Sequence, residues 1–158
     1  MSRHGAEIVW TPDGGFTSGT YSRAHEWRFD GGQNVRGSSS PDVVRAPMSD
    51  PFGVDPEEAL VASASSCHML WFLDLARRAG WDVASYRDAA EGEMGKGADG
   101  RTMITRITLR PEISFTGRRP DATELADLHH RAHEACFIAN SLKTDIFVEP
   151  IAPLVDAG

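Results

Sequence analysis

The sequence has few cysteines, only two among 158 residues. Small domains held by disulfides carry many more, so this chain must build its core from apolar side chains. In a reducing cytosol each of the two cysteines needs its own explanation, which is either packing or chemistry. The length suits one ordinary domain, and we expect residues 1–158 to form a single domain.

Long runs of one residue type are also missing. The longest apolar run, around Met69 to Phe72, is too short to cross a bilayer, and the first ten residues lack the apolar core of a secretory signal. The net charge is −7 and no run of lysine and arginine occurs, which argues against a phosphate-binding surface. We therefore expect a cytosolic (cytoplasmic) protein with no membrane and no nucleic acid among its partners.

The strongest pattern is the stretch from Asp55 to Gly80, DPEEALVASASSCHMLWFLDLARRAG. It opens on an aspartate that can cap the first free amides, and it closes on two arginines and a glycine. These signals predict a helix from about Pro56 to Ala79. Apolar residues wrap most of its circumference, which is typical of a buried helix, so we expect Cys67 inside the protein.

The remaining chain predicts strands and one more helix, so the fold class is α+β. The second helix is amphipathic and ends close to Cys136. The expected elements are a strand over Phe16–Asp30, its hairpin partner Gln33–Ser38, an ordered loop from Ser38 to Val54, hairpin strands Trp81–Met94 and Thr102–Phe115, the helix from Asp121 to about Glu134, and a last strand Thr144–Glu149.

The first long strand places a cation among aromatic residues. Alternation puts Tyr21, Arg23, His25 and Trp27 on one face, which we expect to be the inward one. An arginine on that face needs a partner or a task. The alternative is that its stem lies on Tyr21 while its charged head reaches water, and the sequence leaves both readings open.

A reactive Cys67 would need help to ionise. Burial raises the pKa of a thiol, and the helix dipole is felt only within the first turn. A cation must therefore come from elsewhere, held by a carboxylate such as Glu57. Glu57 precedes Cys67 by ten positions, about 15 Å along the helix axis. If Glu57 belongs to the Cys67 site, it should reach the Cys67 of a second subunit. This predicts a homodimer with antiparallel central helices.

Two other readings of these residues compete. Both cysteines could be unrelated core residues, because free cysteine packs as a small hydrophobe. Alternatively, His129 and His133 share a helix face with Cys136 one turn further on, as metal ligands often do. The order does not match the zinc-protease motif, and histidines on a helix face are more often solvated, so we expect no metal.

Two segments resemble the OsmC/Ohr family, named for osmotic and organic-hydroperoxide stress. VDPEEALVASASSC is similar to the family motif in which a Pro-Glu pair opens the central helix and the peroxidatic cysteine follows ten residues after the glutamate. HEACFIANSLKTDI resembles the segment around the family's resolving cysteine. One departure is Phe137, which stands where the family usually has proline and is expected to alter the mouth of the site.

The resemblance implies the OsmC-like fold, with two central helices enclosed by curved antiparallel sheets in an intertwined homodimer. It also implies a thiol peroxidase in which Cys67 attacks an organic hydroperoxide and Cys136 captures the resulting sulfenic acid as a disulfide. No cofactor is implied beyond an external dithiol reductant, such as a lipoyl group.

The resemblance does not fix the cation. Arg23, Arg36 and Arg45 all precede Glu57 at plausible distances, and the inward strand face favours Arg23 as its partner. The residues expected to line the substrate pocket are Trp71, Phe72, Tyr21 and His25. The alternative function is a non-enzymatic binder of a small apolar ligand, built on the same fold with inert cysteines.

Overall fold

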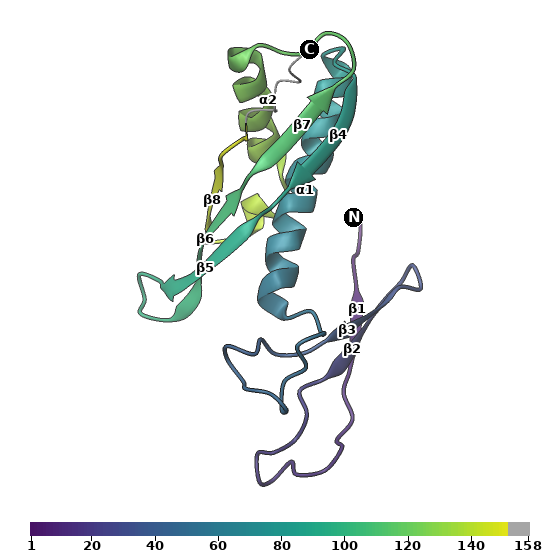
Figure 1. Cartoon of the computed structure of the whole chain (residues 1–158), viewed down its shortest axis with the longest axis vertical. Coiled ribbons are helices and arrows are strands. Elements are labelled where there is room, and N and C mark those ends of the chain that lie inside the picture. The colour runs from purple at the N-terminus through teal and green to yellow at the C-terminus, as the bar shows by residue number, and fades with distance from the viewer. Residues whose placement is uncertain (152–158) are drawn as a thin grey trace, which may run out of the picture. The chain divides into compact units, whose positions relative to one another are not determined.

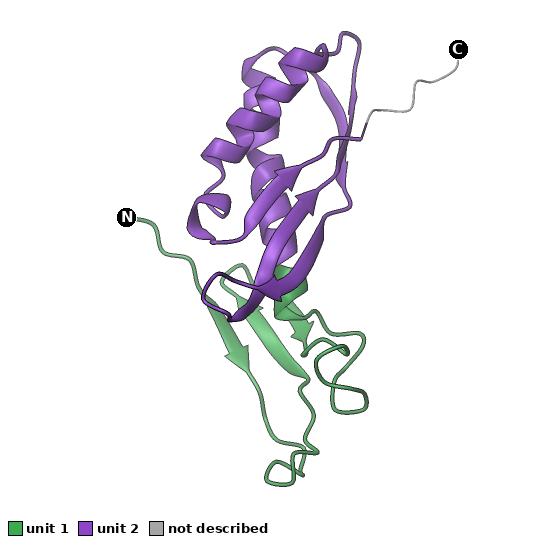
Figure 2. Cartoon of the chain, turned by 90° about the vertical axis from the view of Figure 1, so that its left-hand side faces the viewer, with its two compact units in different colours: residues 1–59 green, residues 60–158 purple. Residues whose placement is uncertain are grey.

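A computed structural model gives the structure of the protein and describes residues 1–151. The chain divides into two compact units, residues 1–59 and 60–158 (Figure 2). Each unit has its own hydrogen-bonded strands, with one three-stranded sheet in the first and two sheets in the second (Figure 1). The α+β class expected from the sequence is confirmed.

The first unit contains an antiparallel sheet in the order β1-β2-β3. The strands are β1 (Ala6–Val9), β2 (His25–Phe29) and β3 (Asn34–Gly37). The predicted strand over Phe16–Asp30 was wrong in its first half, which is a loop. Its backbone groups bond elsewhere: the Ser22 N–H donates to Asp13 and the Arg23 N–H to the carbonyl of Met48.

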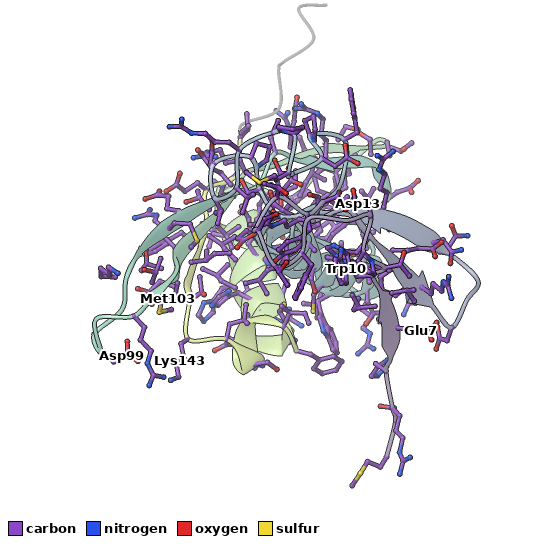
Figure 3. The ribbon with its side chains drawn as sticks, turned by 90° about the horizontal axis from the view of Figure 1, so that it is seen from below. Glu7, Trp10, Asp13, Asp99, Met103 and Lys143 are labelled. Carbon is purple, nitrogen blue, oxygen red and sulfur yellow. The ribbon has the colours of Figure 1, made fainter. Side chains whose placement is uncertain are left out.

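The loop between β1 and β2 is held by side chains. The Trp10 ring N–H donates to the Ser22 carbonyl at 2.9 Å, and Asp13 accepts from the Ser22 N–H at 3.1 Å; Figure 3 labels both side chains. The rings of Trp10, Phe16 and Tyr21 pack against one another with centroids 5.0–5.7 Å apart. This contact orders a loop that carries several glycines.

The segment between β3 and the first helix is ordered, as predicted. Ser38 is fully buried, and its hydroxyl accepts from the Asp50 N–H at 2.9 Å. The Asp50 carboxylate forms an ion pair with Arg36. The Ser38 and Val54 backbones bond across the base of the loop, which closes it directly before the helix.

Helix α1 (Pro56–Arg78) matches the predicted bounds to within one residue. Asp55 accepts from the Glu58 N–H at 2.7 Å while Glu58 accepts from the Asp55 N–H at 3.1 Å, a reciprocal cap that satisfies two free amides. By length and composition alone α1 could cross a membrane, a property that core helices of many proteins share.

Burial along α1 differs from the prediction of a helix buried all round. Its buried residues are Ala64, His68, Phe72, Leu75 and Ala76, a spacing of three and four that defines one face. Leu70 is 61% exposed and Cys67 is only half-buried. The sequence shows which residues are apolar, but only the packed chain shows which of them find a partner.

The second unit pairs its strands in two sheets. Strand β4 (Val83–Asp88) is antiparallel to β7 (Pro111–Phe115), and β6 (Thr102–Leu109) lies between antiparallel β5 (Glu91–Lys96) and parallel β8 (Asp145–Val148). The two long hairpin strands of the prediction are therefore each broken in two. At one break the Arg110 N–H donates to the Asp88 carboxylate at 2.6 Å instead of to a strand.

Helix α2 (Ala122–Ala135) begins at a capping box formed by Asp121 and Glu124. It packs Leu128 and Ala132 against Phe72 of α1 in one core cluster. A second cluster joins α1 to β6 around Ala64 and Ile107. Together the two clusters fix the middle of α1 and the end of α2, where the two cysteines lie.

Candidate active site

The structure brings the two cysteines together. Cys67 lies in the middle of α1 and Cys136 caps the carboxyl end of α2; both are free thiols. Cys136 is 2% exposed, and the Cys67 thiol is near enough to be one of the groups that raise its pKa. Two stretches that are far apart in the sequence thus bring their cysteines into one neighbourhood, a question that the sequence had left open.

The environments of the two sulfurs differ. Burial, followed by the influence of the neighbouring Cys67 thiol, raises the pKa of Cys136 to about 11. The Ala139 N–H donates to Cys136 Sγ at 3.4 Å, which acts in the opposite direction without reversing the shift. Cys136 is therefore a protonated thiol at neutral pH, and Cys67 is the more exposed of the two sulfurs.

Cys67 opens onto an apolar pocket of about 520 Å³. Its wall includes Trp71, whose ring meets Phe137 edge to face at 5.4 Å. Phe137, which stands where the family usually has proline, lines this pocket and is 69% exposed. The pocket is lined by Ser63, Ser66, Cys67, Leu70, Trp71, Asp74, Phe137 and Ile138.

Phe72 lies away from this pocket, although we expected it to form part of the wall. It is completely buried in the core between the helices, with its ring 4.6 Å from the His129 ring and 5.8 Å from the Tyr86 ring. Successive helical residues point about 100° apart, so Trp71 and Phe72 face different surroundings. The aromatic run in the sequence could not show which of the two faces the thiol.

Four of the predicted residues line a different pocket, which lies within the first unit. Tyr21, Arg23, His25 and Glu57 surround a cavity of about 450 Å³, together with the aromatic rings of the β1–β2 loop. An arginine and a glutamate thus share one cavity with apolar walls.

Arg23 is held by backbone groups and by an aromatic face. Its Nη1 donates to the carbonyl of Tyr21 at 2.5 Å and of Gly19 at 3.2 Å, and its guanidinium carbon lies 3.8 Å from the Tyr21 ring centroid. Within residues 1–151, Arg23 makes no ion pair with a carboxylate. The charged head of Arg23, and not its stem, therefore lies on Tyr21, at the wall of the cavity that also contains Glu57.

His25 is fixed in one orientation and one tautomer. Its Nε2 accepts from the Trp27 ring N–H at 2.6 Å, so its Nδ1 carries the proton and donates to the Arg23 carbonyl at 2.8 Å. Both ring nitrogens are therefore occupied by the protein. His25 shapes the pocket and positions the Arg23 backbone, and it is not available as a free base.

The other two candidate cations, Arg36 and Arg45, do not line this cavity. Arg36 is paired with the nearly buried carboxylate of Asp50, so its charge is already compensated. Arg45 lies on the exposed part of the loop between β3 and α1. Of the three arginines, only Arg23 lines the cavity that also contains Glu57.

A histidine pair beside the cysteines was not foreseen. His68 Nε2 and His129 Nδ1 lie 3.1 Å apart in a hydrogen bond that joins α1 to α2, and their rings are stacked at an interplanar angle of 7°. The two residues are 61 positions apart, so no local signal could link them. Over residues 1–151, no group of three or more histidine, cysteine, aspartate or glutamate residues could hold a metal ion.

The histidine pair should make the fold acid-sensitive. Burial is the main cause that lowers the pKa of both His68 and His129 to about 4, against an ordinary value near 6.5. Between these values the unfolded chain binds protons that the folded chain does not, so stability falls as the pH falls. We expect a loss of roughly 1–1.5 kcal/mol between pH 7 and 6, and of roughly 2–2.5 kcal/mol between pH 6 and 5, when urea unfolding is measured at these three values.

The control for this experiment is His129→Phe, which removes one of the two titrating groups. Its slope over the same window should be about half that of the parent. A flat profile in the parent, or an unchanged slope in the variant, would contradict the assignment.

The class of protein is defined by an α+β fold with one free cysteine in the middle of α1 and another at the end of α2. The chain belongs to the OsmC-like protein family, which matches residues 48–150, more than half of its length and including both cysteines. The resemblance seen in the two cysteine segments is thereby confirmed. No curated protein gave a match.

Solved structures agree with this assignment. An OsmC-like protein of unknown function from Vibrio cholerae is 47% identical, with 96% of this chain and 100% of that chain covered and a TM-score of 0.93. Organic hydroperoxide resistance proteins share the fold at 19% identity: one from Elizabethkingia anophelis (95% and 94% covered, TM-score 0.66) and one from Bacillus subtilis (93% and 98% covered, TM-score 0.65).

Proposed function

We propose that this protein is a thiol peroxidase that reduces organic hydroperoxides in defence against oxidative stress in the cytosol. The observation that carries the proposal is that Cys67 lines an apolar pocket together with Phe137 and Ile138, the two residues that follow Cys136. Cys67 is half-buried and Cys136 is buried. This suits a pair in which Cys67 meets the substrate and Cys136 captures the oxidised sulfur.

In the proposed reaction the Cys67 thiolate attacks the distal oxygen of the hydroperoxide. The O–O bond breaks, the alkoxide takes a proton to leave as an alcohol, and Cys67 becomes a sulfenic acid. The Cys136 sulfur then displaces the hydroxyl, which leaves as water with the thiol's proton, and a disulfide forms. An external dithiol, such as a lipoyl group, restores both thiols by exchange.

The raised pKa of Cys136 supports this order of events. A thiol that remains protonated is a poor nucleophile toward a peroxide in solution. It becomes useful when the neighbouring sulfur carries a hydroxyl that can accept its proton. The apolar lining around Trp71 favours an organic hydroperoxide over hydrogen peroxide, because burial of an alkyl or aryl group contributes to binding.

Thiol titration tests the proposal against the alternative of an inert binder. One equivalent of cumene hydroperoxide should remove both thiols at once, and mass spectrometry of the oxidised chain should find a Cys67–Cys136 link. An equal dose of cumyl alcohol is the matched control and should remove neither. If both thiols survive the peroxide, the protein is not a peroxidase, and ligand binding on this fold becomes the better account.

We assign the activating cation to Arg23 with Glu57 as its carboxylate, in a homodimer. The support is that both line one cavity and that Glu57 precedes Cys67 by ten helical residues, about 15 Å. Glu57 therefore cannot reach the Cys67 of its own chain, and the carboxylate at each thiol would be Glu57 of the partner subunit. The exposed apolar residue Leu70 on α1 is consistent with a helix that gains a neighbour by association.

The dimer is tested by sedimentation of the reduced protein. We expect a species of twice the chain mass of 17.2 kDa, with activity that falls on dilution below the dissociation constant. Leu70→Glu, at the exposed face of α1, should favour the monomer, whereas the same charge at the exposed position Ala84 should not. A fully active monomer would remove the assignment of Glu57.

A further inference from the structure

Two aromatic rings meet at nearly a right angle in the wall of the Cys67 pocket. The Trp71 and Phe137 rings have centroids 5.4 Å apart and an interplanar angle of 86°. Both residues line the pocket and both belong to the second unit, so one chain supplies the whole pair. Phe137 is 69% exposed and Trp71 is only partly buried. The two rings therefore form an aromatic corner with surface left for a third ring.

The backbone around Phe137 is held on both sides. The Cys136 sulfur accepts from the Ala139 N–H at 3.4 Å, and the Cys136 carbonyl accepts from the Asn140 N–H at 3.0 Å. The Phe137 carbonyl accepts from the Ser141 hydroxyl at 2.7 Å. These bonds fix the position from which the Phe137 ring extends, so the aromatic corner is a built part of the pocket wall.

The aromatic corner lies close to the reactive sulfur. Trp71 follows Cys67 by four residues on α1, which puts the two side chains on one helix face, with their Cβ atoms about 5–6 Å apart. Phe137 directly follows Cys136. A substrate ring that lies in the corner must therefore be attached close to the peroxide group that Cys67 attacks.

We propose that the Cys67 pocket selects hydroperoxides with an aromatic ring on the carbon that bears the peroxide group, and that Phe137 determines this preference; the preference presupposes the peroxidase activity proposed above. Aromatic rings pair best in offset-stacked or edge-to-face arrangements. Because the Trp71 and Phe137 rings are nearly perpendicular, a third ring that stacks on one of them meets the other edge to face. A saturated ring lacks this polarised face and edge and gains only from burial.

The test compares cumene hydroperoxide with 2-cyclohexylpropan-2-yl hydroperoxide, which has the same carbon skeleton with a saturated ring. Because the two peroxides also differ in intrinsic reactivity, the quantity measured is the ratio of their kcat/KM values in the full chain and in its variants. Phe137→Leu, which keeps an apolar side chain but removes the ring, should lower this ratio about fivefold, the size of one aromatic ring pair. An unchanged ratio would overturn the proposal.

Two further variants control for the substitution itself. Phe137→Tyr keeps a ring at the corner and should keep the parent's ratio. Phe147→Leu makes the change from phenylalanine to leucine at an exposed position on β8, outside the pocket, and should keep the ratio as well. A fall of the ratio in either variant would overturn the role of the Phe137 ring.

Binding of the two product alcohols separates the aromatic preference from the peroxidase activity. Cumyl alcohol and 2-cyclohexylpropan-2-ol are compared by ligand-observed NMR on the reduced protein, and Phe137→Leu should lower the ratio of their affinities about fivefold. If neither peroxide is consumed but this change is seen, the peroxidase function fails and the aromatic preference of the pocket stands. An affinity ratio that Phe137→Leu leaves unchanged would overturn the preference, whatever the activity.

Discussion

Cys67→Ser should lower the rate of cumene hydroperoxide reduction by on the order of 10³-fold or more, because a serine hydroxyl is not ionised at neutral pH and cannot form a sulfenic acid. The substitution replaces one sulfur atom by oxygen at a half-buried position, so the fold should be retained. Activity is measured with dithiothreitol as the reductant, and the variant's circular dichroism is compared with the parent's.

Cys136→Ser is the matched control. It should react with one equivalent of hydroperoxide at a rate near the parent's and then stall as a sulfenic acid, which over-oxidises with further peroxide. The pair of variants separates the nucleophile from the resolver. Should both consume peroxide as the parent does, neither sulfur would have a role in the reaction.

Phe72→Ala should lower the free energy of unfolding by about 3–5 kcal/mol, the usual cost of removing a fully buried aromatic side chain. Phe72, a residue of α1, has no exposed surface and packs against α2 and β4. Its loss therefore leaves a cavity that the surrounding helices cannot fill. A loss of this size is a large part of the stability of an ordinary domain. Urea unfolding followed by circular dichroism measures it.

Phe137→Ala supplies the comparison, since it removes the same atoms from a ring that is 69% exposed. Its cost should stay below about 1 kcal/mol, because little apolar surface returns to water. Equal losses in the two variants would contradict the placement of Phe72 in the core and of Phe137 at the pocket mouth.

The helices were predictable from the sequence because their ends carry local signals. Asp55 with the arginines of the last turn bounds α1, and Asp121 with Glu124 caps α2. The strands were less predictable. No signal near Phe16 shows that the loop before β2 uses its backbone groups in turns. The break at Arg110 depends on the Asp88 carboxylate, 22 residues away.

The candidate site, too, was only partly predictable from the sequence. The segments around Cys67 and Cys136 indicated the thiol pair, and in the structure the residues that follow Cys136 line the pocket of Cys67. Which face of α1 each aromatic residue takes is decided by packing, so Trp71 could not be separated from Phe72 in advance. The contact between His68 and His129 depends on how two helices meet, and no sequence pattern marks it.

The parallel pairing of β6 with β8 has a consequence for how this protein is made. The strand that completes the sheet, Asp145–Val148, is the last regular element of the described chain, and Ile146 and Val148 pack onto the second core cluster. During synthesis on the ribosome that cluster therefore stays open until β8 has emerged. Until then one edge of β6 is unpaired, and an unpaired strand edge can pair with another chain.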